Sequence, residues 1–346
     1  MDRSPTDAAP LAVGPRASAG GPRVVFAGMR GSFSRIALAG LLAAGADVRG
    51  VLVAAEAGDA PPAGGAKATD RGAEPGGVPA IWSEAPRAVP RSTLPLLTSH
   101  REASIMTLGW ERGIPVLAVG RERDPNVRAR LAALAPDAVC VACWPRRVPT
   151  ALLDLARYGW LNLHPSPLPA HRGPAPLFWT FRAGESETGV TVHRMDATLD
   201  GGEILAQEPI AVPDGIAGDV LEDRCAEIGG RLLARVLRDL AAGTVRPCLA
   251  GSGAGSYEPM PGPDDFNVTP DRSARWAFNF IRGAAYWGGP IAIVVAGRRF
   301  AVAEALDYIP GAASGEADRW EEPYRVDGRE LWLRCAPGIL RVRLAE

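Results

Sequence analysis

The sequence predicts an α/β protein with two domains: an N-terminal domain built on a parallel, doubly wound sheet, and a small C-terminal β-barrel domain. Short apolar runs alternate with helical patterns between residues 23 and 164. Such alternation produces parallel β-α-β units with right-handed crossovers. A stretch rich in Gly and Pro follows at 243–263, and beyond it come short strand-like runs at close spacing. That spacing is typical of small barrels.

Length and composition fit this division. The chain has 346 residues, 47% of them hydrophobic, which is enough for two full cores. Residues 1–22 are rich in Ala, Pro, Gly and Ser and lack the apolar segment of a signal peptide, so they are expected to form a disordered tail. No apolar run is long enough to span a membrane, which favours a cytoplasmic protein. The predicted domains are 23–243 and 263–346, joined by a linker at 244–262.

Charge and cysteine usage narrow the function classes. The net charge is −1 and the pI is about 6.5, so no global basic field indicates nucleic-acid binding. The five Cys residues are scattered and there are four His, which argues against a zinc site. Cys140 and Cys143 form a lone C-x-x-C inside an apolar run, where two small buried thiols are favoured over a redox pair.

The first half of the chain begins with the strand Arg23–Gly28. The residues after it do not form a G-x-G-x-x-G turn, so a dinucleotide site is not expected. Residues 55–78 are expected to be a mobile, neutral loop. The other expected elements are helix 36–44, strand 48–54, helix 98–112, strand 115–119, helix 125–134 capped by Asp124, strand 137–143, helix 149–156 and strand 161–164.

The second half of the chain also shows helix and strand patterns. Residues 219–242 are amphipathic and are expected to pack as the last helix of the first domain. The remaining expected elements are helix 175–183, strands 189–196 and 203–212, helix 271–282, and strands 291–295, 300–306, 324–326, 330–334 and 339–344.

The candidate site lies where strand 161–164 ends. Asn162 and His164 are two residues apart, so on a strand their side chains point to the same side. Prolines at 165, 167 and 169 then force a stiff, extended loop. An amide donor and an imidazole therefore stand together at the carboxyl end of a strand, where ligands bind in open parallel sheets.

A second stretch, residues 188–205, contains Thr188-Gly-Val-Thr and Leu199-Asp-Gly-Gly. Together with Asn162-Leu-His164 and the loop ending in Arg172-Gly173, it resembles the formyltransferases that use 10-formyltetrahydrofolate. The resemblance runs from about Val24 to the end of the chain. It implies a Rossmann-like catalytic domain and an OB-like C-terminal barrel. Asn279-Phe-Ile-Arg-Gly resembles the helix that begins the barrel in methionyl-tRNA formyltransferases, whose layout is the most similar.

The resemblance also implies roles. Asn162 and His164 would donate hydrogen bonds to the oxyanion of a tetrahedral intermediate. Asp200 would raise the pKa of His164, keep it protonated and help relay a proton. No metal and no covalent nucleophile is needed. Contacts with 10-formyltetrahydrofolate are expected from Cys143, Trp144, Pro145, Arg146, Arg147, Ser166, Leu168, Pro169, Gly173, Met195, Asp196 and Leu199.

Other polar side chains of these stretches are less telling. His193 is expected to be structural, since it stands in mid-strand with no partner at useful spacing. His171 and Arg172 remain open between a place in the site and a solvated loop.

The acceptor stays open at this point. The layout favours the amino group of methionyl-tRNA, but the barrel from Pro263 onward holds 11 Arg and no Lys against 12 acidic residues. Phosphate binding would then need a local cluster, with Arg272, Arg275, Arg282, Arg298 and Arg299 as candidates. The alternatives are a small amine such as a nucleotide-linked amino sugar, hydrolysis of 10-formyltetrahydrofolate, or a non-enzymatic folate- or RNA-binding module.

Overall fold

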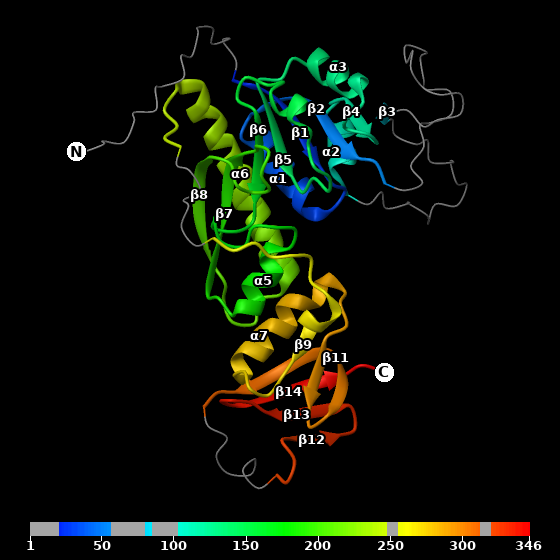
Figure 1. Cartoon of the computed structure of the whole chain (residues 1–346), viewed down its shortest axis with the longest axis vertical. Helices are drawn as coiled ribbons and strands as arrows, with labels where there is room; N and C mark the ends of the chain where they lie inside the picture. The colour runs from blue at the N-terminus through cyan, green and yellow to red at the C-terminus, as the bar shows by residue number, and fades with distance from the viewer. Residues whose placement is uncertain (1–20, 57–79, 85–102, 248–254, 312–319) are drawn as a thin grey trace, which may run out of the picture.

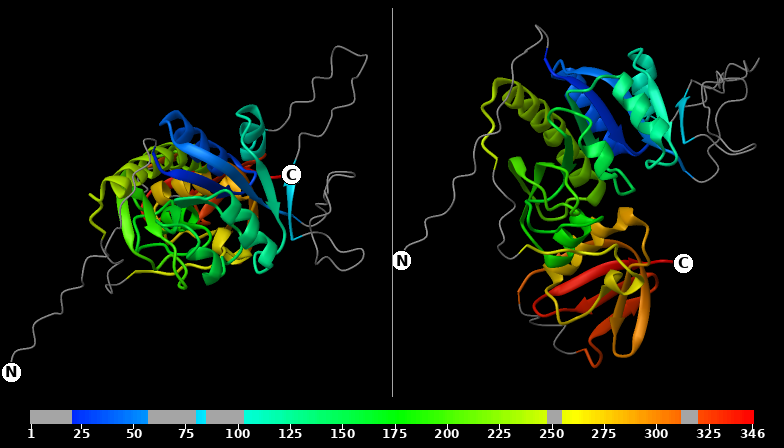
Figure 2. Two further views of the ribbon diagram at one scale, coloured as in Figure 1. Left: turned by 90° about the horizontal axis from the view of Figure 1, so that it is seen from above. Right: turned by 45° about the horizontal axis from the view of Figure 1, so that its top comes forward.

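A computed structural model describes residues 21–56, 80–84, 103–247, 255–311 and 320–346. The predicted tail at 1–22 and the loop at 55–78 therefore lie almost wholly outside the described residues. The residues that the structure describes form an eight-stranded sheet and a six-stranded sheet, which lie one beyond the other along the long axis of the molecule (Figures 1 and 2). Among the described helices, none is long and apolar enough to cross a membrane.

The first sheet has the strand order β3-β4-β2-β1-β5-β6-β7-β8. Its strands are β1 (Arg23–Gly28), β2 (Asp47–Ala54), β3 (Ile81–Glu84), β4 (Val116–Val119), β5 (Ala138–Ala142), β6 (Trp160–His164), β7 (Glu187–Arg194) and β8 (Ile204–Ala211). Strands β4, β2, β1, β5 and β6 run parallel. This confirms the expected α/β fold with a sheet dominated by parallel strands.

The two edges of this sheet depart from the expected all-parallel arrangement. Strand β3, which the sequence analysis missed, pairs antiparallel with β4. At the other edge β6, β7 and β8 pair antiparallel. The loop between β7 and β8 is too short for the crossover that parallel neighbours need, so the two strands form a hairpin. That hairpin loop carries Asp200 back to the end of β6.

Within the described residues, six helices accompany the first sheet, namely α1 (Ser32–Ala43), α2 (Ile105–Glu111), α3 (Pro125–Ala133), α4 (Thr150–Leu153), α5 (Pro176–Ala183) and α6 (Gly218–Ala242). Helices α1 and α6 share one core with the sheet, and α3 and α4 share the core on the opposite face. Asp124 caps α3 as predicted, because its side chain accepts from Asn126 N at 2.9 Å. Helix α1 begins at Ser32 rather than at Ile36, and α4 is a single turn.

The second sheet has the order β12-β13-β14-β11-β10-β9 and is antiparallel except for the β9–β10 pair. Its elements are η1 (Pro263–Phe266), β9 (Asn267–Val268), α7 (Ala274–Ala284), η2 (Ala285–Trp287), β10 (Ala292–Val295), β11 (Arg298–Ile309), β12 (Tyr324–Asp327), β13 (Glu330–Arg334) and β14 (Ile339–Leu344). Helix α7 begins at Ala274 rather than at Asp271, with the Ser273 side chain as its cap.

Aromatic side chains join the two sheets into one core. The Phe178 ring on α5 lies 5.0 Å from Phe266 and 5.7 Å from both Phe280 and Trp287, measured between ring centroids. One buried cluster contains residues of β1 as well as residues of β13 and β14. Helix α7 is therefore shared between the sheets, and the position of the second sheet relative to the first is fixed by packing.

A polar clasp reinforces this junction. The Asp214 carboxylate, in the loop between β8 and α6, accepts hydrogen bonds from Arg275 Nε at 2.9 Å, Asn279 Nδ2 at 2.8 Å and Tyr308 Oη at 3.1 Å. Arg282 Nε donates to the Gly215 carbonyl at 2.7 Å. Two of the arginines expected to meet phosphates thus hold the first sheet's loop against α7.

Candidate active site

Asn162 and His164 are placed by the alternation of β6. Leu161 and Leu163 are buried in the core that faces α1 and α6. Gly229 of α6 lies against Leu163 so closely that a side chain there would collide with it. The neighbouring side chains of Asn162 and His164 therefore point to the opposite face, as the sequence predicts.

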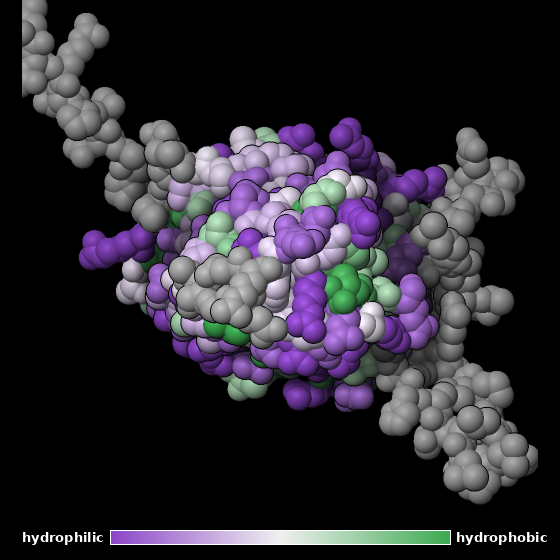
Figure 3. Space-filling view, turned by 90° about the horizontal axis from the view of Figure 1, so that it is seen from below, coloured by the Kyte–Doolittle hydropathy of each residue, from purple (hydrophilic) through white to green (hydrophobic). Residues whose placement is uncertain are grey.

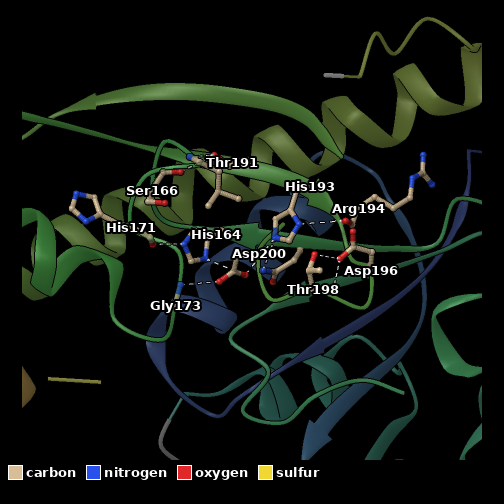
Figure 4. A network of polar contacts seen from close by, with 12 residues as sticks. His164, Ser166, His171, Gly173, Thr191, His193, Arg194, Asp196, Thr198 and Asp200 are labelled. Atoms are coloured by element: carbon tan, nitrogen blue, oxygen red, sulfur yellow. Dashed lines mark hydrogen bonds and ion pairs between the residues drawn. The ribbon is translucent and has the colours of Figure 1, made fainter. Parts of the chain in front are cut away.

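The hairpin loop between β7 and β8 brings Asp200 to these residues (Figure 4). His164 Nδ1 lies 3.8 Å from Asp200 Oδ1, and the two residues are 5% and 7% exposed. Asp200 has φ 51°, a left-handed conformation that costs free energy in a residue other than glycine. Cys143 and His171, on the two neighbouring loops, have φ 57° and 52°. Such strained residues cluster at functional sites.

His193 is a member of this cluster that the sequence analysis missed. Its Nε2 lies 3.0 Å from Asn162 Nδ2 and 3.7 Å from Asp200 Oδ1, and the residue is 1% exposed. The expectation that His193 has no partner was therefore wrong. The missed signal is the antiparallel pairing of β6 with β7, whose register sets His193 opposite Asn162. Had that pairing been recognised, both side chains would have been placed on one face.

The proton on His193 decides how Asn162 is oriented. With this proton on Nδ1, which lies 3.4 Å from the Arg194 carbonyl, Nε2 accepts a hydrogen bond from the Asn162 amide. The amide nitrogen of Asn162 has two N–H groups, and one of them is used in this bond. The second is left to donate to a ligand.

The protonation expected for His164 is wrong in direction. Burial lowers the pKa of His164, and this effect outweighs the nearby Asp200 carboxylate and the His171 carbonyl, which both raise it. Burial also opposes ionisation of Asp200, but contacts with His193, His164 and the Gly173 amide together lower its pKa. The site therefore holds a neutral imidazole beside a carboxylate.

This direction predicts a dependence of stability on pH. Below about pH 6.5 the unfolded chain binds a proton at His164 more readily than the folded chain does. The free energy of unfolding will therefore fall as pH decreases through about 6.5 towards the folded pKa, while Asp200 stays ionised. Urea unfolding at a series of pH values measures this, and His164→Gln should remove part of the slope. Equal slopes in the two proteins would contradict the assignment.

The loop after β6 fixes His164 and Asp200 through its backbone. His164 Nε2 lies 3.0 Å from the His171 carbonyl, and the Gly173 amide donates to Asp200 Oδ2 at 2.9 Å. A carbonyl can only accept, so Nε2 carries the imidazole proton and Nδ1 faces Asp200. His171 is buried, and its Nε2 lies 3.1 Å from both carboxylate oxygens of Glu185. Of the two open readings for His171, a solvated loop does not apply.

Ser166 and Leu168 hold the shape of this loop. Ser166 is fully buried and its hydroxyl donates to the Ala170 carbonyl at 2.7 Å. Thr191 Oγ1 donates to the Ser166 carbonyl at 2.7 Å and accepts from Leu168 N at 3.1 Å. Leu168 is 3% exposed. Both side chains face the protein, whereas Pro169 is half-buried and Gly173 is buried.

The loop from Cys143 to Arg147 lies beside the Asp200 loop. Arg147 donates to the Ala197 carbonyl, and Arg146 bonds Glu122 and the Ala55 carbonyl. Pro145 is exposed, and Trp144 packs on the core with a buried Nε1 that has no hydrogen-bond partner in the described part of the chain. Cys143 is exposed, so the expectation of two buried thiols holds for Cys140 but is wrong for Cys143. The turn of φ 57° after β5 carries the Cys143 side chain out of the sheet.

The Asp200 loop presents an apolar side chain to solvent. Leu199 is 60% exposed, and Met195, at the start of the same loop, is half-buried. Asp196 accepts from Thr198 N at 2.7 Å, which closes an Asx turn and shapes the loop. Among the described residues, no group of three metal-ligating side chains is present. The arrangement can therefore present an amide, an imidazole and a carboxylate to a carbonyl group, with an apolar rim for a flat ligand.

Comparisons with known proteins agree with this chemistry. A family model described as formyl transferase matches residues 95–237. A methionyl-tRNA formyltransferase of Anaeromyxobacter sp. (strain K) is 35% identical over 249 residues, covering 70% of this chain and 78% of that protein. A methionyl-tRNA formyltransferase of Frankia casuarinae is 42% identical over 156 residues, covering 45% and 46%.

Two solved structures share the fold at low sequence identity. One is WlaRD, a sugar 3N-formyl transferase, with a TM-score of 0.60 at 10% identity, covering 93% of this chain and 97% of that one. The other is an N-formyltransferase from Helicobacter canadensis, with a TM-score of 0.60 at 13% identity, covering 93% and 98%. At these identities the likeness concerns the fold.

Proposed function

Because the chain belongs to the formyl transferase family, we propose that it transfers a formyl group from 10-formyltetrahydrofolate to the amino group of initiator methionyl-tRNA. The observation that supports the transfer step is the cluster at the end of β6, where the buried His164 and His193 both approach Asp200 and the half-buried Asn162 contacts His193. The family uses this folate as formyl donor, and its relatives named above supply the acceptor. The protein would then act in the cytoplasm, at translation initiation.

The residues divide the chemistry as follows. The acceptor nitrogen attacks the formyl carbon, and the carbonyl oxygen becomes an oxyanion. The Asn162 amide donates its remaining N–H to that oxygen, and preorganised donors of this kind are usually the largest catalytic contribution. His164 Nδ1 takes a proton as the attacking amine becomes cationic, and Asp200 stabilises the imidazolium that forms. The C–N10 bond then breaks, and the proton passes to N10 as the folate leaves.

The folate would lie along the two loops from Cys143 to Arg147 and from Met195 to Leu199. Leu199 supplies an exposed apolar contact, and Trp144 Nε1 and the loop backbones supply hydrogen-bonding groups. Pro145, Pro169 and Asp196 would line the approach. Arg146 and Arg147 would anchor these loops rather than reach the ligand, since their guanidinium groups already bond protein carbonyls.

The domain boundaries belong to the same proposal. Residues 23–243 would form the catalytic domain, 244–262 the linker and 263–346 an OB-like barrel that receives the tRNA. The six-stranded sheet with α7 packed on it supports an OB-like barrel, although β12 and β9 stand at its two ends. In Figure 3, hydrophilic residues cover most of the end of the molecule that this sheet forms, and hydrophobic ones are isolated. Such a surface suits a polar partner.

The salt dependence of tRNA recognition tests the acceptor. Arg275 and Arg282 are unsuitable probes because they hold the Asp214 loop. Arg272 and Arg298 are exposed and better placed. If both meet phosphates, Arg272→Gln with Arg298→Gln should flatten the slope of log KM for methionyl-tRNA against log salt by about 0.7–0.9 per contact. Steady-state kinetics from low to moderate salt measure it.

A matched control separates a local contact from a general charge effect. Arg238→Gln removes an exposed arginine near the carboxyl end of α6, which Figure 1 shows far from the second sheet. It should leave the slope unchanged. A flat slope in the wild-type protein, or no formylation of methionyl-tRNA beside rapid formylation of a nucleotide-linked amino sugar, would move the function to a small amine. The balanced charge of the second sheet is the observation that favours that alternative.

A further inference from the structure

The segment 255–260, here called the strap, lies directly on the loop that ends β6. The Arg172 amide donates to the Ser256 carbonyl at 3.1 Å, and the Glu258 amide donates to the Arg172 carbonyl at 2.8 Å. Farther along, Trp179 Nε1 donates to the Pro259 carbonyl at 2.9 Å. A Cβ on Gly173 would collide with the Glu258 carbonyl. The strap and the loop are therefore in contact through their backbones.

The side chain of Ser256, in the strap, adds a hydrogen bond to the loop residue that contacts His164. Ser256 Oγ accepts from the His171 amide at 2.8 Å. The carbonyl of the same His171 lies 3.0 Å from His164 Nε2. A short chain of contacts thus runs from the strap through one residue of the loop to the imidazole that serves formyl transfer. Among the described residues, no hydrogen bond joins Ser256 to the His164 imidazole directly.

His171 needs such support. Its φ of 52° is a left-handed conformation that residues with a side chain adopt at a cost. Its amide is half-buried, and a half-buried donor without a partner favours a rearranged backbone. If the Ser256 hydroxyl is lost, the loop can relieve both costs by turning the His171 backbone, and its carbonyl then leaves His164.

We propose that Ser256 is a positioning residue for formyl transfer: by holding His171, it keeps the imidazole of His164 protonated on Nε2 and open on Nδ1, towards Asp200. The role of Ser256 in formyl transfer rests on the function proposed above, whereas its effect on the tautomer of His164 does not. The strap also leads directly into η1 and α7. The segment joining the two sheets therefore supports the geometry of the site as well as connecting them.

Two variants of one position test the proposal. Ser256→Ala removes the hydroxyl, and Ser256→Thr keeps it. Nitrogen-15 NMR of the imidazole rings distinguishes the two tautomers, and the chain has four His to assign. We expect the Nε2–H form of His164 in the wild-type protein and in Ser256→Thr, and a mixture of both tautomers in Ser256→Ala. This measurement needs no acceptor, so it remains decisive even if methionyl-tRNA is not the substrate.

Kinetics give the second readout. Ser256→Ala should lower kcat by about tenfold, the effect of weakening one hydrogen bond near the reacting groups, with little change in KM for the formyl donor. Ser256→Thr should restore kcat. Met260→Ala is the matched control, because Met260 lies on the same strap with a side chain 63% exposed. Unchanged ring signals and kcat in Ser256→Ala, or a lower melting temperature with normal kcat, would overturn the proposal.

Discussion

His164→Ala will lower turnover by roughly a hundredfold or more, which is the scale of losing a general base. The imidazole stands between the Asp200 carboxylate and the His171 carbonyl, so its removal deletes both the proton acceptor and the charge formed during attack. The fold should persist, because Leu161 and Leu163 hold β6 in the core. Single-turnover formylation with saturating folate measures the effect.

Binding of the folate controls this experiment. The two loops proposed to hold the pterin contact it without His164, so the dissociation constant from a fluorescence titration should change little. Near-native turnover in His164→Ala would return this residue to a structural role. A parallel loss of folate binding would instead mean that the loop from Ser166 to Gly173 had moved.

Asp200→Asn should reduce turnover on a similar scale, by about a hundredfold. The amide keeps an oxygen for the Gly173 N–H but loses the negative charge beside His164. Since that charge raises the pKa of His164 against the effect of burial, the imidazole becomes a weaker base without it. The acidic limb of the variant's pH–rate profile, along which protonation of His164 removes the base, should therefore shift to lower pH. A stopped-flow or quenched assay over a range of pH gives both quantities.

Glu203→Gln is the matched control for this change. Glu203 ends the same loop, is not among the residues proposed to contact the folate, and accepts from Arg194 Nε at 3.2 Å, an interaction that a glutamine oxygen reproduces. Its turnover should stay within a few-fold of the wild-type value. Should both substitutions reduce turnover equally, the loss would come from the shape of the loop and not from the charge of Asp200.

Elements whose local signals agree were predictable from the sequence. Strand β1 and helix α3 are examples, because an apolar run followed by Gly and an Asp-Pro start are signals within a few residues. Helix α1 shows the limit. Gly31 precedes it without a side-chain cap, so nothing local marks the start at Ser32. Strand β3 pairs only through its distant partner β4, and short strands of this kind carry little pattern of their own.

The candidate site also has parts that the sequence predicts and parts that it does not. The side-by-side placement of Asn162 and His164 follows from the period of a strand and was predictable. His193 was not, because its role depends on which strand pairs with β6 and in what register. The direction of the shift in the pKa of His164 depends on how much water the whole fold excludes, and the expected approach of one acid, Asp200, gives no measure of that.

The clasp at Asp214 is another feature that could not be predicted from the sequence. Arg275 and Arg282 look in the sequence like two cations on one exposed helical face. Their partners lie in a loop more than one element away along the chain, between β8 and α6. A sequence shows which residues are charged, but it does not show whether the folded protein pairs those charges with partners.

The shared aromatic core has a consequence for how the chain is made. During synthesis from the N-terminus, α5 leaves the ribosome before η1, α7 and η2, which supply the rings that cover Phe178. Until those residues emerge, the nascent chain carries an uncovered apolar surface of the kind that chaperones recognise. The strap also reaches the loop of the site only at this stage, so the catalytic groups are locked in place late in translation. A nascent chain that does not yet include the strap would therefore be inactive.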